Sequence, residues 1–214
     1  MAPKRRRADQ SSPQPEPEPA PAPPLRTLKS QPVVVFAHGA GAPSSSDWMV
    51  HWKKMVQDAL DAVDVVTFDY PYMSGGKRRA PPKAEKLVDH HLGVVKDAAS
   101  KYQGHPIILM GKSMGSRVSC MVANSDDIDV CAVVCLGYPL KGSKDGLCPL
   151  DRLGSTRKKM TCKNELHVVD GGDHSLKVGK RYLESRMLNQ HDVEMKAVKA
   201  ISQFVQNSIT EICT

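Results

Sequence analysis

The chain has 214 residues, of which 40% are hydrophobic and 25% are charged. This is the composition of a globular domain, and no apolar run approaches the roughly 18 residues of a transmembrane helix, so neither a fibrous nor a membrane protein is expected. The formal net charge is +7, but residues 1–32 hold six basic and three acidic residues, which leaves +4 for the other 182. A mildly basic enzyme fits this balance as well as a nucleic-acid-binding protein does.

Residues 1–32 predict a basic, proline-rich arm. Nine of the sixteen prolines fall between Pro3 and Pro32. Proline donates no backbone hydrogen bond and the segment has almost nothing apolar to bury, so we expect a disordered arm that favours polyproline II. The run KRRR at residues 4–7 is either a nuclear import signal or a solvated basic start. Without a secretory or acyl-anchor pattern, the chain is expected in the cytoplasm, the nucleus or both.

From residue 33 onward, short apolar runs alternate with amphipathic segments, which predicts one folded domain over residues 33–210. The expected helices are about 47–62, 84–102, 114–124, 147–160 and 192–208. The expected strands are 33–37, 63–68, 106–110, 130–136 and 165–170. Strands that alternate with helices predict an α/β fold, with a mostly parallel sheet of about five strands and helices on both faces.

The six cysteines indicate neither a disulfide framework nor a metal site. They stand at positions 120, 131, 135, 148, 162 and 213, without a C-x-x-C pair. We expect reduced thiols, with Cys120, Cys131 and Cys135 acting as small buried hydrophobic residues. Zinc ligands would be more closely spaced, so no metal is expected, and nothing indicates an organic cofactor.

The sharpest motif is Gly111-Lys112-Ser113-Met114-Gly115, a G-x-S-x-G between an expected strand and an expected helix. A nucleophilic serine on a strand-to-helix turn needs small neighbours, because strand and helix approach closely there. Such a turn lifts the Ser113 hydroxyl above the carboxyl edge of the sheet. It also aims the Met114 N–H at the place where an oxyanion would form. The alternative is a chance glycine-serine turn at a helix start.

The second motif, His38-Gly39-Ala40-Gly41, directly follows the first expected strand. Glycines let the backbone approach a ligand closely, so we expect His38, Gly39 and Gly41 to bind substrate. Ala40 is expected to supply the second oxyanion N–H. A simple strand-exit turn is the alternative. The segment fits neither common phosphate-loop pattern, so phosphate binding is not favoured.

The third motif, Asp170-Gly171-Gly172-Asp173-His174, ends the fifth expected strand. A histidine on a loop at the carboxyl end of a strand can reach over the serine turn and act as a general base. The other seven histidines fall in the glycine loop, on helices, before or within strands, or in a polar loop. His174 is therefore the candidate base.

A serine–histidine pair also needs a carboxylate that orients the imidazole, and along this kind of chain the order is Ser, acid, His. Asp145 follows the fourth expected strand at the correct edge of the sheet and is the first choice. Asp170 and Asp151 remain alternatives, and Asp145 can also be an ordinary solvated loop residue. Asp173 is adjacent to His174 and badly placed to meet its ring.

Six segments together resemble the α/β-hydrolase superfamily. They are FAHGAGAPSSSDW, FDYPY, GKSMGSR, LGYPLKG, SKDGLCP and GGDHS. More specifically, they resemble the testis-expressed/non-specific-lethal-complex subunit 3-like family, which is related to dienelactone hydrolases. The resemblance covers about residues 33–208. It implies nucleophile Ser113, acid Asp145 and base His174. Animal members include a subunit of a nuclear histone-acetyltransferase complex.

One stretch departs from that family pattern. A helix and a strand that normally precede the acid are missing between Gly142 and Ser143. The fourth and fifth strands then either pair directly through a right-handed crossover, or leave a gap with unpaired backbone groups. Either outcome can misplace a triad that depends on fine geometry, so we expect low activity.

Two functions follow from these patterns. The first is a serine hydrolase of the esterase or thioesterase type, acting on a small acyl substrate. The second is a catalytically weak or inactive hydrolase-fold subunit of a nuclear chromatin-regulating complex. A membrane partner is not expected. Nucleic-acid binding through residues 77–79 and the arm is the weakest alternative, because few aromatic residues stand among the basic ones.

Overall fold

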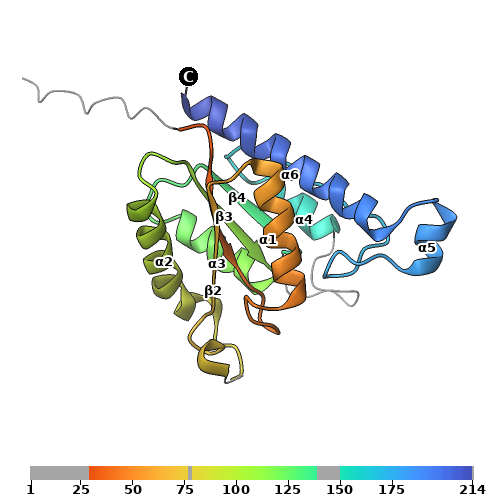
Figure 1. Ribbon diagram of the computed structural model, residues 1–214, viewed down its shortest axis with the longest axis horizontal. Helices are drawn as coiled ribbons and strands as arrows, with labels where there is room; N and C mark the ends of the chain where they lie inside the picture. The colour runs from red at the N-terminus through yellow and green to blue at the C-terminus, as the bar shows by residue number, and fades with distance from the viewer. Residues whose placement is uncertain (1–28, 77–78, 139–149, 214) are drawn as a thin grey trace, which may run out of the picture.

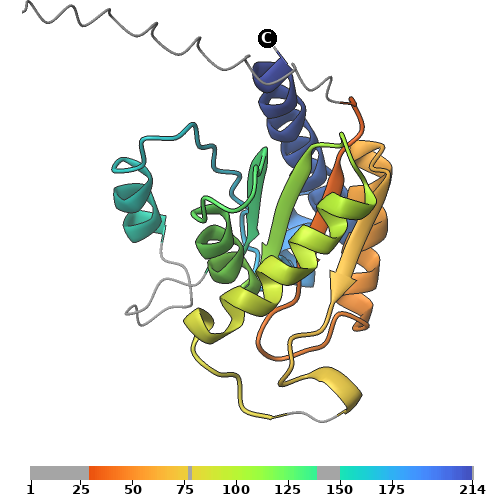
Figure 2. The same cartoon turned by 90° about the vertical axis from the view of Figure 1, so that its left-hand side faces the viewer.

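The computed structural model describes residues 29–76, 79–138 and 150–213, in which a parallel sheet lies between two layers of helices (Figures 1 and 2). Its four strands have the order β2-β1-β3-β4. They are β1 (Val33–Ala37), β2 (Asp64–Phe68), β3 (Ile107–Lys112) and β4 (Ala132–Leu136). In the register, Val35 of β1 lies beside Val66 of β2 and Leu109 of β3. Because β1 is central and covered on both faces, its five residues are all buried.

Two long helices cover one face of the sheet and two cover the other. Helices α1 (Asp47–Leu60) and α6 (Gln190–Cys213) lie side by side on the first face (Figure 1). Helices α2 (Val88–Lys101) and α3 (Met114–Ala123) cover the second face (Figure 2). The shorter elements are two 3₁₀ turns and two helices, namely η1 (Ser74–Gly76), η2 (Ala84–Leu87), α4 (Leu150–Arg157) and α5 (Lys180–Ser185).

The alternation of side chains along β1 divides the core into two apolar layers. Val34 and Phe36 face α1 and α6, where they pack with Trp52 among others. Val33 and Val35 face α2 and α3 and join a second cluster. Apolar side chains therefore shield both faces of β1 from solvent. The pairing of β1 with β3 places the carboxyl ends of the two strands side by side.

The α/β fold is confirmed, but the fifth expected strand is wrong. Residues 165–170 form no strand in the described chain, and Leu166 and Val168 stay 38% and 41% exposed. An alternating apolar run becomes a strand only when another strand offers its edge at about 4.8 Å, and this segment does not pair with β4. Neither arrangement expected for the shortened chain, a fifth strand paired with β4 or a fifth strand beside a gap, is present among the described residues, because 165–170 form no strand.

The expected burial of three cysteines is also corrected. Cys120 on α3 and Cys131 before β4 are only half-buried, and Cys135 on β4 is exposed. Cys135 is exposed because β4 is the last strand of the described sheet.

The expected arm lies, up to residue 28, outside the described residues. Within the described part of the chain, no helix is both long enough and apolar enough to cross a membrane.

Candidate active site

Ser113 stands on a strained turn between the end of β3 and the start of α3. Its φ is 53° and its ψ is −112°, a conformation that a residue with a side chain rarely adopts. The Ser113 N–H donates to the Leu136 carbonyl at 2.9 Å, which ties the turn to the end of β4. The hydroxyl makes no capping hydrogen bond to α3. A half-buried serine at the carboxyl edge of the sheet is thus held in place by its backbone, and its hydroxyl is not used for capping.

The two glycines that flank Ser113 allow this turn by close contact. A methyl group on Gly111 would lie 2.3 Å from the carbonyl carbon of Gly115. A methyl group on Gly115 would lie 2.6 Å from the Ala37 carbonyl oxygen. Real side chains do not come this close to backbone atoms, so α3 can pack against β1 and β3 only with glycine at both positions. This is the physical reason for the G-x-S-x-G spacing.

The loop after β1 runs beside Ser113. A methyl group on Gly39 would lie 3.5 Å from the Ser113 Cβ atom. His38 is fully buried under this loop. Its Nε2 accepts the Tyr70 N–H at 3.1 Å, so its Nδ1 carries the proton and donates to the Gly39 carbonyl at 2.6 Å. Burial lowers the pKa of His38, which keeps the ring neutral in this role.

Tyr72 holds the same loop from the other side. Its hydroxyl donates to the Gly39 carbonyl at 3.3 Å and to the Ala40 carbonyl at 3.4 Å. Burial and the nearby Asp69 raise the pKa of Tyr72 to about 12, so the hydroxyl keeps its proton. In a trans peptide the C=O and the next N–H point in opposite directions. The Ala40 N–H therefore points away from His38 and Tyr72.

His174 lies against the end of β4. A methyl group on Gly137, the residue after β4, would be 3.2 Å from the His174 Nδ1 atom. The Nε2 atom is buried and has no hydrogen-bond partner among the described residues. Leu136, immediately before Gly137, accepts the Ser113 N–H. The end of β4 thus contacts both the serine turn and the histidine, although no hydrogen bond joins Ser113 to the imidazole.

The surroundings of His174 keep its ring neutral. Burial lowers the pKa of His174, and the Lys112 ammonium lowers it further, while Asp173 acts in the opposite direction. Asp173 itself shapes the loop, because its carboxylate accepts the Ser175 N–H at 2.7 Å and the Lys177 N–H at 2.9 Å. A neutral imidazole with an unpartnered nitrogen is chemically suited to accept a proton.

The acid of the expected triad cannot be placed beside these groups. Asp145, the first choice, lies in 139–149, outside the described residues. Asp151 on α4 and Asp170 before the histidine loop are both exposed, and neither forms a hydrogen bond with His174 within the described part of the chain. The assignment of an acid stays a prediction.

Lys112 is a residue of this site that sequence analysis missed. Its Nζ atom lies 4.0 Å from the centre of the Trp48 ring and donates to the Ser175 Oγ at 3.0 Å. The Trp48 indole N–H donates to the Ser175 carbonyl at 2.9 Å. We call Lys112, Trp48 and Ser175 the Lys112 cluster. Through Ser175, the residue after His174, this cluster joins the histidine loop to the serine turn and to α1. The sequence pattern did not predict a role for this lysine, because its partners Trp48 and Ser175 are far away along the chain.

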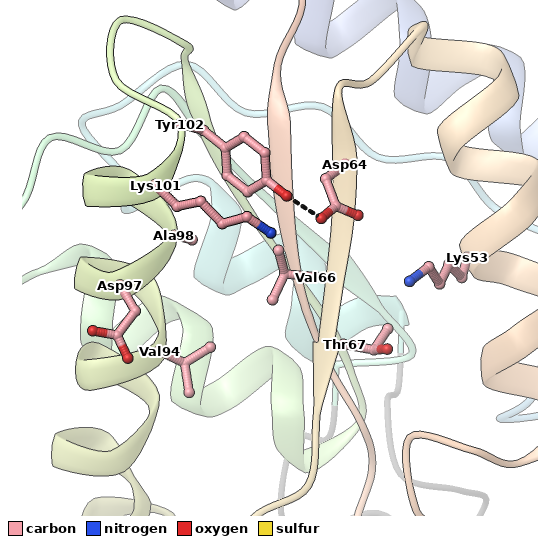
Figure 3. Close-up of a pocket in the computed structure, with 9 residues that line it drawn as sticks. All are labelled: Lys53, Asp64, Val66, Thr67, Val94, Asp97, Ala98, Lys101 and Tyr102. Atoms are coloured by element: carbon pink, nitrogen blue, oxygen red, sulfur yellow. Dashed lines mark hydrogen bonds between the residues drawn. The ribbon is translucent and has the colours of Figure 1, made fainter.

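A pocket of about 400 Å³ lies elsewhere, at the outer edge of β2 (Figure 3). Asp64 at the start of β2 accepts a hydrogen bond from the Tyr102 hydroxyl there. Ser113 follows the carboxyl end of β3, so this pocket belongs to another part of the sheet. In residues 29–76, 79–138 and 150–213, no group of three His, Cys, Asp or Glu side chains could hold a metal ion.

A parallel sheet with a strained serine turn at its carboxyl edge defines the α/β-hydrolase class of fold. Residues 30–144 match the family model described as "Alpha/beta hydrolase domain", and the chain belongs to this family.

Two solved structures share the fold. One, an alpha-beta serine hydrolase homologue from Coxiella burnetii, is 14% identical with a TM-score of 0.57, over 83% of this chain and 87% of that one. The other, a putative hydrolase of the alpha/beta superfamily from Xanthomonas campestris pv. campestris, is 14% identical with a TM-score of 0.52, over 85% and 99%. At these identities the likeness shows the fold alone.

Proposed function

We propose that the protein is a serine hydrolase that cleaves a small ester or thioester. The observation that carries the proposal is the conformation of Ser113, which has a positive φ and is packed between two glycines that no larger residue could replace. Strain of this kind persists only where the surrounding structure enforces it, and it is concentrated at functional sites. The likeness to the testis-expressed/non-specific-lethal-complex subunit 3-like branch of the family agrees with this proposal.

The proposed reaction assigns a chemical role to each group. The Ser113 hydroxyl attacks the acyl carbon and passes its proton to the Nε2 of His174, which is neutral for the reasons given above. The C–O or C–S bond then breaks, and His174 gives the proton to the leaving alcohol or thiol. Water, activated by His174, releases the acid from Ser113. Asp145 orients the imidazole.

Two backbone groups stabilise the negative charge on the acyl oxygen. The Met114 N–H belongs to the first turn of α3, where N–H groups have no partner inside the helix. The Ala40 N–H is turned away from His38 and Tyr72 by the hydrogen bonds that hold the Gly39 carbonyl. Fixed donors of this kind contribute more than any other group in many acyl-transfer sites. His38, which the motif predicted to bind substrate, is fully buried with both ring nitrogens hydrogen-bonded to the backbone, so its proposed role is to support the oxyanion loop. Gly39 and Gly41 line the substrate side.

The test is labelling of the purified full chain with a fluorophosphonate, which reacts with activated serines. We expect labelling that is lost in Ser113→Ala and after heat denaturation. Ser125→Ala is the matched control, because Ser125 follows the carboxyl end of α3, whereas Ser113 precedes its amino end. A chain that unfolds cooperatively yet takes no label at Ser113 would overturn the proposal.

Two observations favour a second function. In the part of the chain that the structure describes, His174 Nε2 has no hydrogen bond to Ser113, and residues 165–170, which lead to it, form no strand. A loosely held base would give a hydrolase fold with little or no activity, acting as a subunit of a nuclear protein complex. Cooperative unfolding without labelling, together with full biological function of Ser113→Ala, would favour this second function.

A further inference from the structure

Two thiols meet where α3 packs on β4. The Sγ atoms of Cys120 and Cys135 are 3.6 Å apart, which is van der Waals contact. Cys120 lies one helical turn beyond Ser116 on the same face of α3, and the Cys135 thiol is also 4.0 Å from the Ser116 carbonyl oxygen. The two sulfurs therefore face each other across the seam between helix and strand.

We infer that Cys120 and Cys135 are an oxidant-sensitive pair that forms an intramolecular disulfide when the protein meets a peroxide. The two sulfurs are already in contact, so they need to approach by only about 1.5 Å to reach the 2.05 Å of a disulfide. The hydrolase site described above uses neither thiol.

The two cysteines differ in solvent exposure, and this difference assigns them different roles in the oxidation. Cys135 is exposed on the last strand of the described sheet, so a small oxidant reaches it first. Cys120 is half-buried. The hydrogen bond from Cys135 lowers the pKa of Cys120, although burial opposes this effect. Cys120 is the resolving residue because its half-buried sulfur is in contact with the Cys135 sulfur that the oxidant reaches, and a lowered pKa favours the thiolate that this attack needs.

The reaction balances with hydrogen peroxide as the oxidant. The Cys135 thiol gives up its proton and its sulfur attacks one peroxide oxygen; an S–O bond forms, the O–O bond breaks, and the departing hydroxide takes up that proton and leaves as water. The Cys120 thiolate then attacks the Cys135 sulfur, the S–S bond forms and the S–O bond breaks. The departing hydroxide takes up the proton that Cys120 released and leaves as the second water. Two thiols are oxidised to one disulfide, and the peroxide is reduced to two waters.

The linkage would lie next to the serine turn. Leu136, which accepts the Ser113 N–H, directly follows Cys135, and Ser113 directly precedes the helix that carries Cys120. The disulfide would therefore fasten the helix behind Ser113 to the strand that contacts it. Any effect of the disulfide on catalysis rests on the proposed function. The formation of the disulfide itself does not.

The test treats the reduced, purified full chain with hydrogen peroxide and maps its thiols by mass spectrometry. Trypsin cuts after Arg117 and Lys141, which leaves Cys120, Cys131 and Cys135 in one peptide. Cleavage before Asp126 separates Cys120 from the other two. We expect that peptide to lose two hydrogens, and its two halves to stay linked after cleavage until a reductant is added.

Two variants locate the bond. Cys135→Ser is expected to abolish the linkage and Cys131→Ser to leave it unchanged. Cys162 is exposed and serves as an internal control that should be trapped by dimedone as a sulfenic acid, whereas the pair should not. A linkage from Cys120 to Cys131, or dimedone adducts at Cys120 and Cys135 without any linkage, would overturn the inference. Disulfide mapping does not depend on serine labelling. A missing disulfide would therefore not contradict the proposed hydrolase, and missing serine labelling would not contradict the disulfide.

Discussion

His174 lies against Gly137, the residue that directly follows β4. A methyl group at Gly137 would come within 2.9 Å of the His174 carbonyl oxygen and 3.2 Å of its Nδ1 atom, and Gly137 has a φ of 62°. The end of β4 thus positions the histidine. Leu136, the last residue of that strand, accepts the Ser113 N–H. Because residues 165–170 form no strand in the described chain, His174 is held near the sheet by this contact together with the Lys112 cluster at Ser175.

Gly137→Ala should separate the base from the serine. The methyl group strains a left-handed backbone by about 1 kcal/mol and pushes on backbone atoms of the histidine loop. We expect fluorophosphonate labelling at least about tenfold slower, with cooperative unfolding retained. Gly154→Ala on α4 is the control, because nothing lies within 4 Å of its Cβ position. Unchanged labelling in Gly137→Ala would contradict the role given to this contact.

Gly115→Ala should instead damage the fold. Its methyl group would meet the Ala37 and His38 carbonyl oxygens at 2.6 and 2.7 Å, and backbone atoms in the centre of a sheet cannot yield. We expect a loss of about 3 kcal/mol or more in the free energy of unfolding, measured with urea. Gly93→Ala on α2, which has open space around it, should be neutral or slightly stabilising. Equal stability of the two variants would show that α3 does not depend on this close approach.

Lys112→Met tests the Lys112 cluster. The change removes the positive charge beside His174, so the pKa of His174 should rise, although burial, the larger cause of its lowering, remains. The rising limb of labelling against pH should move to higher pH. Loss of the hydrogen bond to Ser175, worth about 1 kcal/mol, should also reduce the plateau rate by about fivefold. Lys180→Met, 90% exposed at its side chain, is the control. An unshifted pH profile would mean that the Lys112 charge does not act on His174.

His91 should make the protein less stable in mild acid. Its ring is fully buried, and burial together with the neighbouring His90 lowers the pKa of His91 from 6.5 to about 3. Between these values the unfolded chain binds one more proton than the folded chain. The contribution of His91 is therefore fully present above pH 6.5 and is lost as the pH falls below it, by about 1.4 kcal/mol per pH unit.

The measurement is urea unfolding of wild type and His91→Phe at pH 7.5 and pH 5.5. The variant should lose less stability between the two pH values, even if it is weaker at both because the Tyr70 hydroxyl loses its partner. His167→Phe, at an exposed position, should behave like wild type. A steeper pH dependence in His91→Phe would contradict a neutral His91 in the folded state.

The elements that rest on a local pattern could be predicted from the sequence. Val33–Ala37 reads as a buried strand because five apolar residues in a row can be covered only between two layers, and the structure confirms it. The turn at Ser113 is equally local, since the glycines on either side of it are needed by any chain that passes from strand to helix so tightly.

How distant segments meet could not be predicted, because it depends on the packing of the whole fold. Residues 165–170 have the alternation of a strand, but pairing needs a neighbouring edge, which pattern alone does not supply. Lys112 and Ser175 are 63 residues apart, and Cys120 and Cys135 meet only because α3 folds back on β4. Hydrogen bonds, ring contacts and thiol contacts act over a few ångströms, so they depend on the packed arrangement of the elements and leave no periodic trace in the chain.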